Sequence, residues 1–107
     1  MTCDDIKLLQ RELKKSLEIL ERERLYTAAF IILFKLLVAK IDYKLCLRGI
    51  IVRNHKHRKE QLEYFHKFKE LKRCYVKLYR RYKGAYRKIV SKEEYFYYKK
   101  FIEKCLE

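Results

Sequence analysis

The residues best suited to chemistry lie close together in the middle of the chain, in the run Arg53-Asn54-His55-Lys56-His57-Arg58 and at the nearby Arg48. Histidine transfers protons near neutral pH, arginine stabilises charge developing on a phosphate, and an amide orients either group. A ribonuclease that uses the 2′-hydroxyl of its RNA as nucleophile needs these parts and no metal. The candidate catalytic residues are Arg48, Arg53, Asn54, His55 and His57. The alternative interpretation is a basic helix N-terminus, capped by Asn54, with surface histidines.

Positive charge is concentrated in the second half of the chain. The formal net charge is +14, and residues 53–100 carry 17 Lys and Arg against 5 Asp and Glu. This surplus favours a polyanionic partner, and we predict RNA; a solvated lysine-rich surface is the alternative. We predict no membrane partner, since the core needs the apolar stripes of the basic helices. The candidate RNA-binding residues are Lys56, Arg58, Lys72, Arg73, Lys77, Arg80, Arg81, Lys83 and Arg87.

Tyrosines are interleaved with these cations, eight of the ten falling between Tyr64 and Tyr98. Aromatic faces beside cations can stack unpaired bases while the cations hold phosphates. Most of these tyrosines fit inward-facing stripes and are expected to fill the core. Tyr79 and Tyr97 fit the stripes less well, so we expect them to be more exposed.

Other kinds of chemistry find little support in the sequence. There is no glycine-rich phosphate loop and no nucleophile elbow, so no cofactor is expected. His55 and His57 could join Cys46 on a zinc ion, but residues two apart point to different sides of a helix, and we predict no metal. The four cysteines are widely spaced. We therefore expect a cytoplasmic protein whose cysteines are buried as free thiols. Asn and Gln are scarce, as in hyperthermophile proteins, in which intracellular disulfides occur. The pairing of the four cysteines therefore stays open.

The elements that position these groups are predicted to be helices. Hydrophobic residues make up 50% of the 107, with no proline and two glycines. This composition favours long helices joined by short turns. We therefore predict an all-α fold: a single domain over residues 1–107, built as an up-and-down bundle of about five helices.

Periodicity and capping residues give the expected helix bounds. The first helix follows Thr2 and ends near 21–24, and a nearly all-apolar central helix runs from Leu25 to Gly49. Its uncharged run of ten residues is too short to span a bilayer. A third helix covers 55 to about 67 after Asn54, and a fifth follows the capping box at Ser91. The third is expected to turn Leu62, Phe65 and Tyr64 inward. The fourth is expected to bury the stripe Leu71, Cys74, Tyr75, Leu78, Tyr82, Ala85, Tyr86 and Ile89.

The chain resembles the HEPN superfamily of prokaryotic helical bundles. The resemblance lies in the apolar segment TAAFIILFKLLVAKIDYKL, the following LRGIIVRNHKHRKEQLEYF, and the tail LYRRYKGAYRKIVSKEEYFYYKKFIEKCLE. It implies a homodimer with a metal-independent endoribonuclease motif of Arg, four to six residues, then His; many members are toxins paired with a nucleotidyltransferase. Arg48 and His55 have the permitted spacing, whereas Arg53-Asn54 has the expected dipeptide and His57 follows after three residues. Non-catalytic members keep the bundle and bind partners, so the alternative is an interaction module for a protein such as a nucleotidyltransferase.

Overall fold

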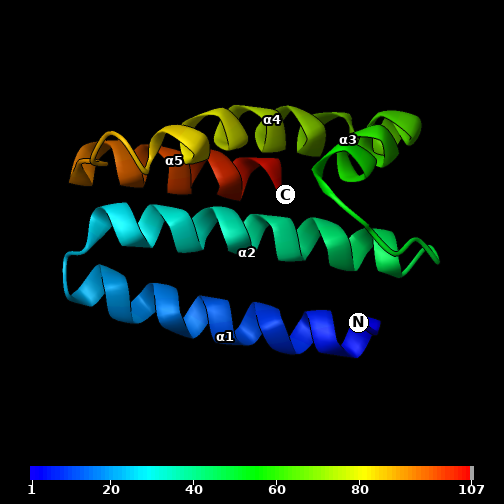
Figure 1. Cartoon of the computed structure of the whole chain (residues 1–107), viewed down its shortest axis with the longest axis horizontal. Helices are drawn as coiled ribbons and strands as arrows, with labels where there is room; N and C mark the ends of the chain where they lie inside the picture. The colour runs from blue at the N-terminus through cyan, green and yellow to red at the C-terminus, as the bar shows by residue number, and fades with distance from the viewer. Residues whose placement is uncertain (107) are drawn as a thin grey trace.

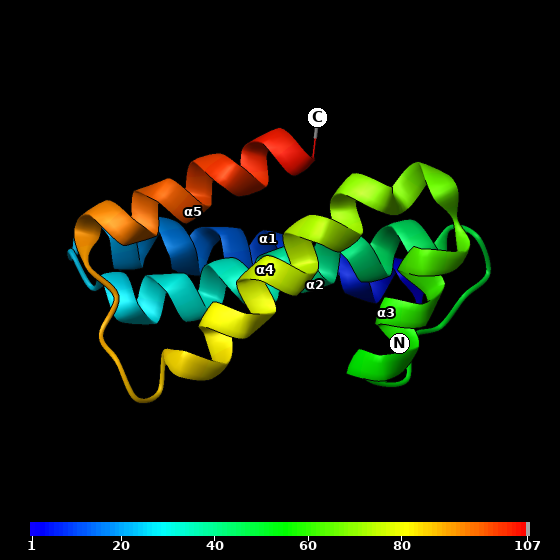
Figure 2. The same cartoon turned by 90° about the horizontal axis from the view of Figure 1, so that it is seen from above.

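The computed structural model describes residues 1–106 and confirms the all-α prediction. Its elements are α1 (Cys3–Arg22), α2 (Tyr26–Cys46), α3 (His55–Tyr64), a 3₁₀ turn η1 (His66–Phe68), α4 (Lys69–Gly84) and α5 (Lys92–Cys105). Four long helices alternate in direction, and the short α3 crosses at one end (Figure 1). Seen from above, α4 crosses over α2, α5 lies to one side of α4, and α1 lies behind (Figure 2). No described helix combines the length and the apolar character needed to cross a membrane.

Helix α2 lies at the centre because it is apolar on nearly every side. Nine of its side chains are buried, among them Phe30, Leu37 and Ile41. A helix that is apolar all round must be covered by neighbours, and here α1, α4 and α5 cover it. The helix ends at Cys46, three residues before the predicted Gly49, which lies in the turn that follows and has a φ of +81°, in the left-handed region. The amide of Ile50 donates to the carbonyl of Leu45 at 3.0 Å, which completes the turn.

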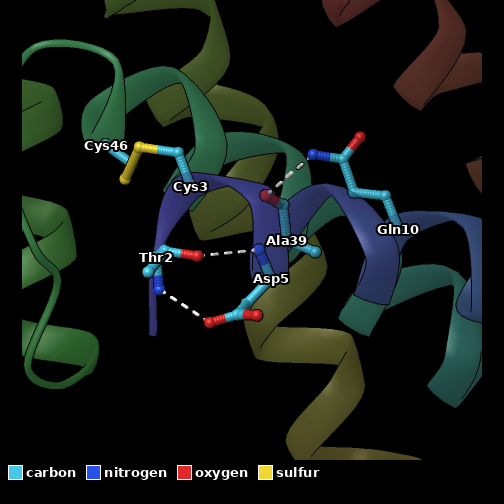
Figure 3. The surroundings of a disulfide bond; sticks show 6 residues. All are labelled: Thr2, Cys3, Asp5, Gln10, Ala39 and Cys46. Carbon is cyan, nitrogen blue, oxygen red and sulfur yellow. Dashed lines mark hydrogen bonds between the residues drawn. A yellow bond between two sulfur atoms is a disulfide. The ribbon is translucent and has the colours of Figure 1, made fainter.

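Helix α1 begins with the expected capping box. The amide of Asp5 donates to Thr2 Oγ1 at 3.1 Å, and the amide of Thr2 donates to Asp5 Oδ2 at 2.9 Å. A disulfide between Cys3 and Cys46 then joins the start of α1 to the end of α2 (Figure 3). The sequence alone left this pairing open.

Helix α3 is shorter than predicted. Asn54 caps it as expected, since its Oδ1 accepts from the amide of His57 at 2.8 Å. The helix stops at Tyr64 and η1 follows, so α3 and α4 are separate. Leu62 is buried, but the prediction that Tyr64 faces inward was wrong because its side chain is 80% exposed at the end of the helix.

The apolar stripe predicted for the fourth helix is buried or half-buried as far as Ala85, the residue that follows the end of the helix. Leu78 and Ala85 are buried, but α4 ends at Gly84. Beyond that point the backbone no longer repeats every 3.6 residues, so Tyr86 and Ile89 are 67% and 81% exposed rather than inward. Helix α5 then begins at its predicted cap, where Ser91 Oγ accepts from the amide of Glu94 at 3.1 Å.

Candidate functional site

The five candidate catalytic residues have different local roles. The guanidinium of Arg48 lies over the rings of Phe65 and Phe68, 4.7 and 5.2 Å from their centroids. Asn54 caps α3, and the amide of Arg53 donates to Nδ1 of His57 at 3.1 Å. Of the five, His55 lines a pocket between the helices.

His55 is held by two tyrosines of α4. Its ring stacks on Tyr79, with centroids 3.7 Å apart and planes 15° from parallel. Its Nδ1 is hydrogen bonded to the hydroxyl of the buried Tyr75. That hydroxyl also accepts from Arg58 Nη1 at 3.1 Å, so its own proton is free to be donated to the imidazole. Tyr75 thereby favours the neutral tautomer of His55 that carries its proton on Nε2.

Arg58 and Asp42 complete this polar network. Arg58 donates to both carboxylate oxygens of Asp42, from Nε at 2.7 Å and from Nη2 at 2.9 Å. Burial acts to lower the pKa of Arg58, but the hydrogen bonds and charge of Asp42 outweigh it, and the pKa is raised. Burial, followed by the charges of Arg58 and neighbouring lysines, lowers the pKa of His55. The lowered pKa favours the neutral imidazole, which keeps one N–H donor.

The network borders a pocket of about 450 Å³ between α1, α2, α3 and α4, here called the interhelical pocket. Its lining is mostly apolar. It includes Ile6, Leu9 and Leu13 of α1, Phe34, Lys35, Val38, Ala39, Asp42 and Cys46 of α2, Ile51 and Val52 of the connector, His55 and Arg58 of α3, and Tyr75, Tyr79 and Tyr82 of α4. Asp42 and the pocket itself were not anticipated, because they depend on how α2 and α3 pack.

A second, larger hollow of about 1090 Å³ lies on another side of α4 and is called the basic groove. It is lined by Lys59, Lys69, Glu70, Lys72, Arg73, Val76, Lys77, Arg80, Arg81 and Tyr98. Seven of these side chains are cationic and one is acidic. Five of the nine candidate RNA-binding residues, namely Lys72, Arg73, Lys77, Arg80 and Arg81, meet there. Lys59 and Lys69 were missed. Lys59 enters the groove only because α3 packs beside α4, whereas Lys69 is the first residue of α4 itself.

The other candidate RNA-binding residues lie elsewhere. Arg58 belongs to the polar network, and Lys83 lies over the ring of Tyr79 at 4.9 Å. Lys56 and Arg87 are exposed outside the groove. Within the groove, Arg81 is already paired with Glu94, donating from Nε at 2.6 Å and from Nη2 at 3.0 Å.

Aromatic side chains border the groove on α5. Tyr98 is part of its lining, and Tyr97 is 54% exposed beside it. The Lys77 ammonium donates to the Tyr97 hydroxyl at 2.6 Å and lies 4.3 Å from the ring centroid of Phe101. The expected exposure of Tyr97 is confirmed, whereas Tyr79 is half-buried against His55. An exposed ring beside free cations is an arrangement that can stack a base next to its phosphate.

Comparison with known proteins gave no match to any family, to any curated protein or to any solved structure.

Proposed function

We propose that this protein binds single-stranded RNA through the basic groove. The observation that carries the proposal is the grouping of seven cations with a single carboxylate in one hollow. Three of the seven cations form ion pairs, Arg81 with Glu94, Lys72 with Glu63 and Arg73 with Glu70. Four cations, Lys59, Lys69, Lys77 and Arg80, are therefore available for phosphates. The exposed ring of Tyr97 favours an unpaired strand over a duplex, because only unpaired bases can stack on it.

The proposed activity is binding rather than cleavage. His55 lines the interhelical pocket, whereas the phosphate-binding cations line the groove. Its Nδ1 is engaged by the hydroxyl of Tyr75, so this nitrogen is not open to the 2′-hydroxyl of a bound strand. Incubation of the purified protein with mixed RNA in EDTA is therefore expected to leave the RNA intact. Cleavage that disappears in His55→Ala would instead support the metal-independent endoribonuclease implied by the HEPN resemblance.

Binding is tested by a salt titration with single-stranded RNA. Four phosphate contacts give a slope of log K against log salt of about −3. The variant Lys77→Gln/Arg80→Gln is expected to make that slope shallower by about 1.4, since each contact contributes about 0.7. The matched control Lys7→Gln/Arg11→Gln removes the same charge from exposed positions of α1. Equal slopes in the two variants, or no binding at about 50 mM salt, would refute the proposal.

A second candidate function is supported by an apolar surface at the opposite end of the bundle from α3. Leu25, Tyr86 and Ile89 are exposed there and border a shallow hollow with Arg24. Arg87 and Lys88 are also exposed on the neighbouring loop. This surface suits an interaction module whose protein partner offers an apolar patch with an acidic rim. Ile89→Glu would abolish such a complex and leave RNA binding unchanged.

A further inference from the structure

The interhelical pocket arises because α1 and α4 both pack on α2 and leave a gap between them. Its α1 wall is aliphatic, formed by Ile6, Leu9 and Leu13, and Val38 of α2 lies on its floor. The opposite wall is aromatic and comes from α4. A volume of about 450 Å³ with a mostly apolar lining and a few polar groups on one side is typical of sites for small apolar ligands.

The polar groups of the pocket define the kind of ligand head that would fit. Asp42 is the acidic residue of the lining, and its two oxygens are bound by Arg58. His55 offers an N–H donor, and no hydrogen-bond partner of its Nε2 occurs within residues 1–106. Lys35 is exposed beside the ring of Tyr82 and makes no ion pair in that same part of the chain. A donor and an unpaired ammonium complement an anion.

Lys83 lies outside the pocket lining but adds a positive charge beside one of its tyrosines, Tyr79. Its ammonium lies 4.9 Å from the ring centroid of Tyr79, the tyrosine on which His55 stacks. Like Lys35, it is an exposed lysine with no ion pair among the described residues. Positive charge is therefore present beside the aromatic wall of the pocket, from Lys35 of the lining and from the nearby Lys83.

We propose that the interhelical pocket binds a fatty acid, with the acyl chain on α2 between α1 and α4 and the carboxylate among Lys35, His55 and Lys83. This site is separate from the basic groove, and RNA and fatty acid bind independently.

The test is displacement of the fluorescent fatty acid cis-parinarate by laurate, with a stoichiometry of one per chain. Laurate is expected to displace the probe, whereas dodecanol, which has no charge, and dodecyltrimethylammonium, which has the opposite charge, are expected to compete much more weakly. Single-stranded RNA is expected not to displace it. Equal competition by all three amphiphiles would show an apolar cavity without head-group recognition and overturn the proposal, as would the absence of saturable binding.

Variants locate the site. Lys35→Gln is expected to weaken laurate binding about fivefold through loss of an exposed charge pair, whereas Lys44→Gln, the same change on α2 outside the pocket, leaves it unchanged. Val38→Phe fills the floor and is expected to abolish binding, with circular dichroism and the unfolding midpoint used to check that it folds. Equal affinities of Lys35→Gln and Lys44→Gln, or unaltered binding by a folded Val38→Phe, would place any fatty acid elsewhere.

Discussion

The disulfide between Cys3 and Cys46 is expected to supply a large part of the stability of this small bundle. It closes a loop with a sequence separation of 43 residues. The loss of chain entropy in the unfolded state for a loop of that length corresponds to about 4 kcal/mol. Since native domains are stable by only about 5–15 kcal/mol, its removal would bring the protein close to unfolding.

The location of the bond explains which region would respond first. At its other end, α1 is held by Glu21, which accepts from the hydroxyl of Tyr95 at 2.7 Å and pairs with Lys99. At the disulfide end the nearest polar link is a hydrogen bond of 3.4 Å from Gln10 Nε2 to the carbonyl of Ala39 (Figure 3). Reduction is therefore expected to increase amide exchange in the first two turns of α1 before the rest of the helix.

The assay compares the wild type with Cys3→Ser/Cys46→Ser in urea and on heating. The double variant is expected to lose about 4 kcal/mol of unfolding free energy, equivalent to a midpoint about 15 °C lower. The wild type in reductant should match it, and the control Cys105→Ser, which alters a free thiol, should stay close to the oxidised wild type. Equal unfolding midpoints for the oxidised wild type and the double variant would falsify the assignment of this stabilisation to the bond.

Two further outcomes follow from the side-chain environments. Hydrogen bonds and charge from Arg81 hold the pKa of Glu94 below its usual 4.5, so the stability from this pair is present above pH 4.5 and is lost as pH falls through the lowered value. The measurement is the urea unfolding midpoint of the wild type and of Glu94→Gln at neutral and acidic pH. The variant should lose less unfolding free energy on acidification than the wild type, with a difference of about 1 kcal/mol or less. Identical pH profiles of the two proteins would contradict this. Burial raises the pKa of the Cys74 thiol, so a maleimide should label Cys105 in the folded protein and Cys74 only after unfolding, as mass spectrometry of the peptides would show.

Local signals predicted the helices well because each acts over a few residues. Thr2, Asn54 and Ser91 cap helices where expected, and Gly49 has a left-handed backbone in the turn that follows α2. The same reasoning failed at Ile89, because an apolar periodicity continued in the sequence after the helix had ended. Periodicity shows which face would be buried if the helix continued, but not whether it does.

The candidate sites were harder to predict because they depend on contacts between helices. The pairing of Asp42 with Arg58 joins residues sixteen positions apart on α2 and α3. Nothing in the local sequence around Asp42 distinguishes it from a solvated carboxylate on a helix. Lys59 enters the basic groove for a similar reason, since α3 must first turn back beside α4. Composition predicted a basic surface, but only the fold shows which residues form the basic groove.

Helix α4 places the interhelical pocket and the basic groove on different sides of the bundle. Tyr75 and Tyr79 line the interhelical pocket, whereas Lys77 and Arg80 line the basic groove. Successive residues of an α-helix are rotated by about 100°, so these two pairs point to different sides of the same rigid element. Helix α3 brings the two sites closer, because Lys59 of the groove lies one turn from His55 and its charge acts on the imidazole. Under the proposed RNA binding, Lys59 is therefore the groove cation best placed to bring a phosphate near His55. If cleavage instead needed the groove of a second molecule, nuclease activity at low protein concentration would rise with the square of that concentration.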